Sequence, residues 1–324
     1  MTQLQGDGAL LEENIPAHAH SKTLQAAGRH ISIVVPAYNE EKGLEGVLAQ
    51  LGGIQNHLRA IGWQADLMVV DDGSVDGTAD VAIRYHGVTL IRHRTNRGYG
   101  AALKTGIQHT TGDLICVTDA DGTYPNEQIP ELANRLIVGG YDMVVGARTG
   151  ENVVIPLSRR PAKWVIGHLA NFVAGEHIPD LNSGLRIFNR AAALRFFGIL
   201  PDGFSFTTTI TLGMLTNGYI VDYQPINYHA RVGQSKIRPV QDTLNFVQLV
   251  MRIALYFRPL KVFVPFSMAL FLLALVWAVT SKLALGQLAD VTTLIIAMTA
   301  IQVLMIGMLA ELINQRLPNR YDKD

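Results

Sequence analysis

The chain has 324 residues, a formal net charge of zero at pH 7 and a single cysteine, Cys116. Zero net charge argues against a general binder of polyanions, nucleic acids included. One cysteine excludes a disulfide framework, and its place in an apolar run predicts a small buried side chain. The length allows two average domains, or one soluble domain with membrane-spanning elements, and the change in composition along the chain favours the second.

The chain opens with residues 1–29, which show no sustained periodicity and predict a loosely ordered extension without a signal peptide. Short apolar runs then alternate with amphipathic stretches, a rhythm typical of βαβ units. The expected strands are Ile31–Pro36, Leu67–Asp71, Val88–Ile91, Leu114–Thr118 and Met143–Val145, and the expected helices lie around 41–60, 76–86, 99–110 and 126–138. The pattern predicts an α/β domain over 30–238 with a mostly parallel sheet covered on both faces.

Polar side chains follow three of these strands at the point where each strand ends. They are Asn39 and Glu40 after the first strand, Asp71 and Asp72 after the second, and Asp119 and Asp121 after the fourth. Ligands of parallel α/β sheets bind beyond the carboxyl ends of the strands, so we expect these side chains to face one cleft.

Asp119 and Asp121 stand two apart after an apolar strand, where both carboxylates can turn toward one hard cation, Mg²⁺ or Mn²⁺. This pattern is weak by itself, since surface carboxylates two apart are common. The run from Asp71 to Ser74 also has an ordinary explanation, an Asx turn with a helix cap.

Taken together, three runs carry a specific resemblance: V-P-A-Y-N-E at 35–40, V-D-D-G-S at 70–74 and D-A-D at 119–121. In this order and spacing they resemble the inverting family 2 glycosyltransferases with a GT-A fold, over about residues 30–260. The resemblance implies a nucleotide-sugar donor and these site residues: Pro36, Tyr38, Glu40, Asp71 and Asp72 at the nucleotide, Asp119 near the ribose and diphosphate, and Asp121 as the principal ligand of Mg²⁺ or Mn²⁺. Thr123 stands where relatives often have Gln, which leaves its contact with the metal in doubt.

Two further features of the sequence were considered as parts of a site, a run that contains glycines and an arginine. The run 97–106 contains glycines but follows the third strand, whereas a dinucleotide fingerprint would need G-x-G-x-x-G after the first, so a Rossmann NAD site is disfavoured. Arg148 ends the fifth strand, and its guanidinium can pair with a phosphate in catalysis or form a surface salt bridge.

The acceptor side lacks the acidic base that such enzymes usually carry, because residues 203–209 contain no carboxylate. A phosphate monoester, with a second pKa of about 6, is already anionic and needs no base. The segment 231–238 resembles the R-x-x-G-x-S-K signature of polyprenyl-phosphate glycosyltransferases, which implies that Arg231, Ser235 and Lys236 bind the acceptor phosphate. Arg160 is a weaker candidate for the same task. The alternative is a polybasic patch that meets lipid head groups.

The C-terminal part predicts an amphipathic helix at 239–260 on the membrane surface, or a core helix of the soluble domain, followed by two transmembrane helices. The first span covers about 262–280 and has Pro265 in its first turn, and the second covers about 288–310. Together they form a hairpin at 261–311. The alternative is a pair of buried core helices. Basic residues concentrate outside the hairpin: Arg252, Arg258 and Lys261 before it, and Arg316, Arg320 and Lys323 in or beside the tail at 312–324, with only Lys282 between the spans. This bias predicts a two-pass protein with its catalytic domain and both termini in the cytoplasm.

The combined expectation is a membrane-anchored transferase that moves one hexose from a UDP- or GDP-linked sugar to dolichyl or undecaprenyl phosphate among membrane lipids. Transfer to a hydroxyl acceptor is the alternative, although the Q-x-x-R-W run of processive synthases is absent. A non-catalytic nucleotide-sugar-binding membrane protein is a further alternative. The sequence leaves open the donor sugar, the prenol length and whether the chain forms a homo-oligomer.

Overall fold

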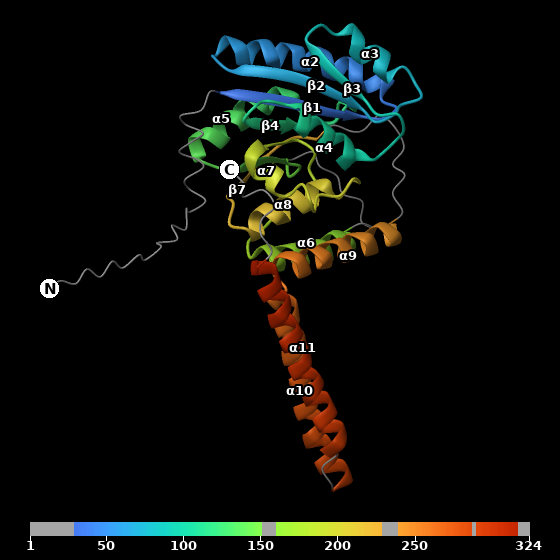
Figure 1. The fold of residues 1–324 in the computed structure, drawn as a ribbon, viewed down its shortest axis with the longest axis vertical. Helices are drawn as coiled ribbons and strands as arrows, with labels where there is room; N and C mark the ends of the chain where they lie inside the picture. The colour runs from blue at the N-terminus through green and yellow to red at the C-terminus, as the bar shows by residue number, and fades with distance from the viewer. Residues whose placement is uncertain (1–28, 151–159, 229–238, 287–289, 317–324) are drawn as a thin grey trace, which may run out of the picture.

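The computed structural model describes residues 29–150, 160–228, 239–286 and 290–316 (Figure 1). One sheet has the strand order β3-β2-β1-β4-β6-β5-β7. The strands are β1 (His30–Ala37), β2 (Gln64–Asp71), β3 (Val88–Arg92), β4 (Leu114–Val117), β5 (Met143–Ala147), β6 (Arg186–Asn189) and β7 (Val221–Pro225). The helices are α2 (Glu41–Ala60), α3 (Thr78–Arg84), α4 (Tyr99–His109), the 3₁₀ helix η1 (Asn126–Gln128), α5 (Ile129–Gly139), α6 (Arg160–Ala174), α7 (Arg190–Arg195), α8 (Phe206–Thr216), α9 (Pro239–Phe257), α10 (Leu260–Leu285) and α11 (Asp290–Arg316).

All five predicted strands are present, but the sheet is mixed, because β6 runs antiparallel to both β4 and β5. Its first residue, Arg186, pairs with Val117 and Val145 and therefore lies at the edge where the parallel strands end. The three residues before β6 are not part of the strand. Ser183 Oγ donates to the Gly146 carbonyl at 2.5 Å, and Gly184 N donates to Tyr124 OH at 2.7 Å. The sequence patterns missed β7, α7 and α8 altogether.

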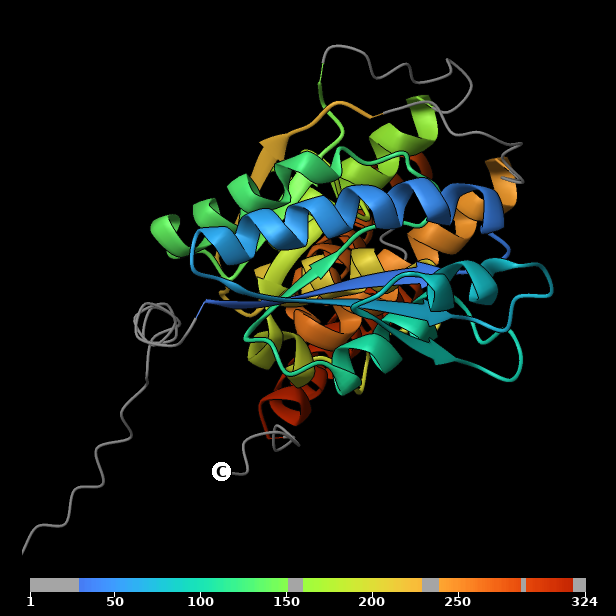
Figure 2. The ribbon, with the colours of Figure 1, turned by 90° about the horizontal axis from the view of Figure 1, so that it is seen from above.

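The core has two layers because side chains alternate along the strands. On β1, Ile31 and Ile33 pack in one cluster with apolar residues of α2 and α5, whereas Val34 packs in the other with residues of α4 and α8. Figure 2 shows α2 and α4 on opposite sides of the sheet. Cys116 on β4 is fully buried, as predicted, and burial raises the pKa of its thiol.

Helix α9 has a buried face and an exposed one. Val250, Ile253 and Ala254 are buried in a third cluster shared with α6 and α8, as in a core helix. Leu255 and Tyr256 on the same helix are 42% and 46% exposed. Helices α6 and α9 lie side by side at the end of the domain from which the hairpin extends (Figure 1). Contact of this exposed face with a membrane stays a prediction.

The two C-terminal helices form an antiparallel hairpin, and each is long and apolar enough to cross a membrane, over Leu260–Ala284 and Val291–Ile313. Only 11% of each span is buried within the chain, which is the opposite of a buried core helix. The expected place of Pro265 was wrong: α10 begins at Leu260, so Pro265 lies inside the helix and cannot donate to the carbonyl four residues earlier. Ser267 Oγ donates to the Ala300 carbonyl at 2.8 Å across the hairpin.

Two of the basic residues before the first span tie the hairpin to the domain. Arg258 donates from Nε and Nη2 to the Thr216 carbonyl at 3.2 and 2.9 Å, and Lys261 Nζ donates to the carbonyls of Phe172 and Val173, both at 3.1 Å. These carbonyls end α8 and α6, where the helix dipole favours a positive charge. Arg258 and Lys261, which were used above to predict the membrane orientation, therefore also cap helices.

Candidate active site

The loops that follow β1 and β2 are joined by hydrogen bonds. Asn39 N donates to Ser74 Oγ and Glu40 N to Thr78 Oγ1, both at 2.9 Å. Asn39 has a φ of +55°, a left-handed conformation that asparagine tolerates better than most residues. Its side chain helps to hold it there, since Asn39 Oδ1 accepts from Val75 N at 3.0 Å. The two strand ends thus form one connected rim.

The end of β4 joins the same rim through α2. A Cβ atom added to Gly43 would lie 2.7 Å from the Ala120 carbonyl oxygen, so the first turn of α2 packs directly on the D-A-D backbone. Asp121 Oδ1 accepts from Thr123 N at 3.1 Å and from Thr123 Oγ1 at 2.6 Å. The threonine whose metal contact was in doubt thus holds the predicted ligand Asp121 in place.

The other predicted ligand, Asp119, lies between a tyrosine and a glycine. Tyr99 OH donates to Asp119 Oδ1 at 3.0 Å, and burial, together with the Asp119 charge, raises the pKa of Tyr99 well above its usual value. A Cβ atom at Gly184 would lie 2.9 Å from both carboxylate oxygens of Asp119. The glycine therefore leaves the space that the carboxylate occupies.

This arrangement fits a hard divalent cation. Asp119 and Asp121 are both partly exposed and offer oxygen ligands, which Mg²⁺ and Mn²⁺ prefer. Among the residues that the structure describes, no group of three or more His, Cys, Asp or Glu side chains could hold a metal ion. A cation at this pair would take its other ligands from substrate oxygens and water, as Mg²⁺ usually does.

We predict that Gly184→Ala lowers transfer activity by about 10- to 100-fold, the usual effect of disturbing the residues that support a metal ligand. The added methyl would displace the Asp119 carboxylate, since its contact distance of 2.9 Å is shorter than real Cβ contacts allow. Gly53→Ala is the matched control, because a Cβ there meets nothing within 4 Å. Initial rates measured over a range of Mn²⁺ concentrations check this, and equal rates for the Gly184 variant and the wild type would contradict it.

Asp71 supports the turn after β2 from a fully buried position. Its Oδ1 accepts from Ser74 N at 2.9 Å, and Arg92 Nε lies 2.9 Å from its Oδ2 in an ion pair without the geometry of a hydrogen bond. Arg92 Nη2 also donates to the Ser74 carbonyl at 3.0 Å. Contact of Asp71 with a nucleotide stays a prediction.

Asp72 is 3% exposed and fastens the loop that leads into α4. Its carboxylate accepts from Arg97 N at 2.9 Å and Gly98 N at 2.7 Å, and His93 Nδ1 lies 2.6 Å from its Oδ1. His93 Nε2 in turn lies 3.0 Å from Thr105 Oγ1. The role of His93 was missed, because one histidine after a strand carries no recognisable pattern. The nucleotide contact predicted for Asp72 likewise stays a prediction.

The remaining residues predicted at the nucleotide differ in their accessibility. Tyr38 is 44% exposed at the end of β1 and so offers a ring face for a base to stack on. Glu40 is partly exposed on the same loop, whereas Pro36 is buried within β1. Pro36 can therefore shape this part of the rim more readily than it can touch a ligand.

Arg148 forms a largely buried ion pair, which neither of its two interpretations anticipated. Its Nε and Nη2 donate to Oδ2 and Oδ1 of Asp180 at 2.8 and 2.9 Å. Its guanidinium carbon Cζ lies 5.4 Å from the centroid of the Tyr228 ring. Burial would raise the pKa of Asp180, but the hydrogen bonds and charge of Arg148 outweigh it and lower that pKa. Nη1 lies outside this pair, and a phosphate contact of Arg148 stays a prediction.

The first turn of α8 contains the threonines of the region without a carboxylate. Thr207, Thr208 and Thr209 are all buried, and the hydroxyls of the last two donate to Asn182 Oδ1 at 2.6 Å and the Ser205 carbonyl at 2.9 Å. These hydroxyls are occupied within the fold.

Beneath this turn lies Arg186, a fully buried arginine that the sequence patterns missed because it reads as one residue of a strand. It donates to the carbonyls of Ser183 and Thr207, both at 3.0 Å, and to Thr211 Oγ1 at 2.9 Å. Burial lowers the pKa of its guanidinium. Arg186 thereby joins the β6 turn to the first turn of α8.

The structure does not describe the side chains of the predicted acceptor-binding residues. Arg231, Ser235 and Lys236 lie outside the described residues. Arg160 is the first residue of α6, and its side chain lies outside the described part. Their phosphate contacts stay predictions.

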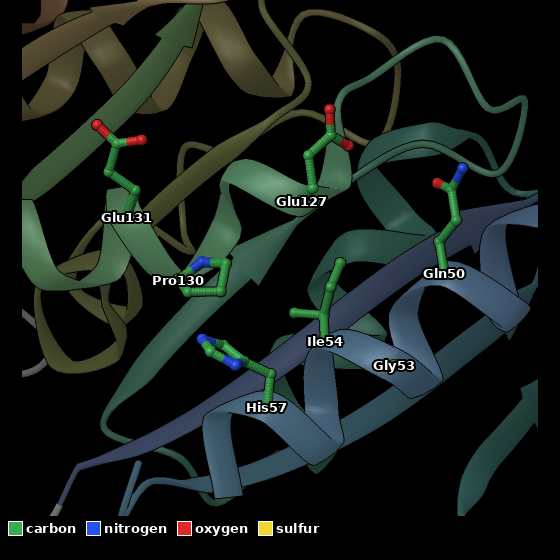
Figure 3. A pocket seen from close by; sticks show the side chains of 7 residues that line it. All are labelled: Gln50, Gly53, Ile54, His57, Glu127, Pro130 and Glu131. Atoms are coloured by element: carbon green, nitrogen blue, oxygen red, sulfur yellow. The ribbon is translucent and has the colours of Figure 1, made fainter. Parts of the chain in front are cut away.

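A groove of about 590 Å³ lies between α2 and the η1–α5 segment (Figure 3). It is lined by Gln50, Gly53, Ile54, His57, Glu127, Pro130 and Glu131. None of these is a predicted site residue. The groove is therefore separate from the rim formed by the strand ends.

The fold and the rim together define a GT-A-like α/β protein with a C-terminal hairpin. Residues 32–197 match the family described as Glycosyl transferase family 2, and residues 258–315 match the family described as GtrB C-terminal hairpin. The chain belongs to glycosyl transferase family 2, and it is a glycosyltransferase.

The chain is also similar to three named relatives and to one solved structure. The chain is 30% identical over 210 residues to the dolichyl-phosphate hexose transferase of Haloferax volcanii, covering 64% of this chain and 87% of that protein. It is 28% identical to the dolichyl-phosphate beta-glucosyltransferase ALG5C of Trichomonas vaginalis, with 71% and 72% covered. It is 32% identical to the undecaprenyl-phosphate 4-deoxy-4-formamido-L-arabinose transferase of Klebsiella pneumoniae, with 50% and 49% covered.

The solved structure is glucosyl-3-phosphoglycerate synthase from Mycobacterium tuberculosis in complex with Mn²⁺, UDP-glucose and phosphoglyceric acid. It superposes with a TM-score of 0.56 at 20% identity, covering 73% of this chain and 83% of that one. At this identity the likeness concerns the fold alone.

Proposed function

We propose that this glycosyltransferase moves one hexose from a UDP- or GDP-linked sugar to a polyprenyl phosphate, with inversion at the anomeric carbon. We place its catalytic domain and both termini on the cytoplasmic side of the membrane. The names of the three relatives, which include dolichyl or undecaprenyl phosphate, support this acceptor class. The C-terminal hairpin supports a reaction at a membrane surface.

The observation that carries the proposal is the first turn of α8. It holds buried threonines and no carboxylate. By resemblance, this is the region in which family 2 enzymes that use a hydroxyl acceptor usually carry the base that removes its proton. A phosphate acceptor needs no such base, because its oxygens are already charged near neutral pH. The structure of this turn therefore favours an anionic acceptor over a hydroxyl.

In the proposed reaction, one set of residues binds the donor and another binds the acceptor. An oxygen of the acceptor phosphate forms a bond to the anomeric carbon while the bond from that carbon to the nucleoside diphosphate breaks. On the donor side, the exposed Tyr38 and the partly exposed Glu40 would contact the nucleotide. A bound Mg²⁺ or Mn²⁺, held by Asp119 and Asp121, would stabilise the charge on the departing diphosphate.

On the acceptor side, the proposal assigns the phosphate to cations and one hydroxyl. Arg231, Ser235 and Lys236 would bind it, with Arg160 as a further contact at the start of α6. Guanidinium and ammonium groups suit this task because they donate charge-assisted hydrogen bonds to phosphate oxygens. Arg148 could approach the same anion through Nη1.

The test is a donor screen with a lipid-product readout. Membranes that contain the protein are incubated with radiolabelled UDP- and GDP-sugars and with a polyprenyl phosphate, and the label that enters the organic phase is counted. We expect a labelled lipid with at least one donor, and none with membranes that carry Asp121→Ala. Unphosphorylated polyprenol is the matched control acceptor.

Label on the unphosphorylated prenol would favour the hydroxyl-acceptor alternative. Absence of labelled lipid with every common donor would reject the proposal.

A further inference from the structure

Two stacked aromatic rings beside Asp119, those of Tyr99 and Phe204, have no role in the reaction as described so far. We propose that Tyr99 is a positioning residue that orients the Asp119 carboxylate toward the divalent cation, and that Phe204 holds the Tyr99 ring in place. This inference rests on the proposed function, because it takes Asp119 to be a cation ligand.

The contact that carries the inference is the hydrogen bond from Tyr99 OH to Asp119 Oδ1, at 3.0 Å. The carboxylate also lies against Gly184, where one added carbon would be 2.9 Å from both of its oxygens. Together the two contacts restrict rotation of the carboxylate. A metal ligand held by a second hydrogen-bonding group binds its cation more tightly than one that must be ordered first.

The sequence Gly98-Tyr99-Gly100 places this tyrosine. A Cβ atom at Gly98 would lie 2.5 Å from the Asp202 carbonyl oxygen, and one at Gly100 would lie 2.1 Å from that of Pro201. Only glycine on each side therefore lets the 200–204 loop dock against the start of α4. The tyrosine between the glycines is left as the side chain that reaches Asp119.

The same loop also contacts Tyr99 itself, through Phe204. The Phe204 ring stacks on that of Tyr99 with centroids 5.5 Å apart and planes inclined by 19°. Phe204 is 80% exposed, so most of its surface other than the stacked part faces solvent. The same loop continues into α8. A continuous set of contacts thus joins the 200–204 loop to the predicted metal ligand.

The experiment measures Mn²⁺ binding by electron paramagnetic resonance, using the full chain purified in detergent, with UDP and separately with GDP. Tyr99→Phe keeps the ring and its stacking and removes only the hydroxyl. We expect its dissociation constant for Mn²⁺ to rise by about tenfold or more. Tyr85→Phe is the matched control, because it removes a similar bond, from Tyr85 OH at the end of α3 to the Glu45 carbonyl of α2 at 3.0 Å, and this bond involves neither carboxylate of the pair. Its Mn²⁺ affinity should equal that of the wild type.

A second variant keeps the inference testable if Tyr99→Phe fails to fold. Phe204→Ala retains the hydroxyl but frees the ring, and we expect Mn²⁺ to bind about two- to tenfold more weakly, in line with the energy of an aromatic pair. Unchanged Mn²⁺ affinity in the folded Tyr99 variant, or in the Phe204 variant when it stands alone, overturns the inference and leaves the proposed function standing. If the wild type binds no Mn²⁺ with either nucleotide, the metal assignment of the proposed function falls with it.

Discussion

Replacing Asp121 with alanine is expected to reduce the transfer rate by about a thousandfold or more, because a bound cation contributes several kcal/mol to stabilising the leaving group and each 1.4 kcal/mol is a factor of ten. Asp121 is partly exposed and accepts hydrogen bonds from Thr123, so the fold should survive its loss. Single-turnover rates with a saturating donor, together with far-UV circular dichroism, measure both parts of this expectation.

Asp113→Ala is the matched control, since Asp113 is an exposed aspartate just before the opposite end of β4. Its rate should be unchanged. Asp121→Asn refines the test, because an amide keeps the size of the side chain and an oxygen for Thr123 but lacks the charge. Near-normal, metal-dependent rates in both Asp121 variants would show that the cation binds elsewhere.

Asp180→Asn is expected to destabilise the protein by about 3 kcal/mol at pH 7, the lower end of the usual cost of leaving one partner of a buried ion pair alone. The lower end applies because the Arg148 side chain is 27% exposed and water can partly replace the lost carboxylate. Denaturant unfolding of the protein in detergent measures the change. Asp222→Asn is the control: its partner Arg135 is 45% exposed, so we expect a loss of about 1 kcal/mol or less.

The same pair gives a pH dependence of definite sign. The pKa of Asp180 is lowered in the folded protein, so its ion pair contributes stability that is fully present above the ordinary aspartate value of about 3.9 and is lost as the pH falls through the folded value. The stability difference between the wild type and Asp180→Asn should therefore shrink as the pH is lowered from 5 toward 3. A difference that grows with acidification would contradict this.

Local patterns were enough to predict much of the fold. The five strands and the helices between them follow from apolar periodicity and turn residues, which act over a few neighbouring positions. The hairpin follows from two long uncharged runs. The expected place of Pro265 was wrong, because the helix begins at Leu260, two residues before the start predicted for the span. Strand β7 is short, and helix α8 is buried along its whole length and so lacks an amphipathic pattern. Neither gave a comparable signal.

For the site, the sequence by itself identified the D-A-D carboxylates, the polar residues of the first two loops and the lack of a carboxylate at 203–209, because each is written in a contiguous run. Only the tertiary structure decided their partners. Asp180 stands 32 residues from Arg148, and Tyr99 stands 20 from Asp119. The antiparallel β6 brings Gly184 and Arg186 to the edge where β4 ends. Such pairings depend on how strands are ordered in the sheet, and no local run of residues specifies that order.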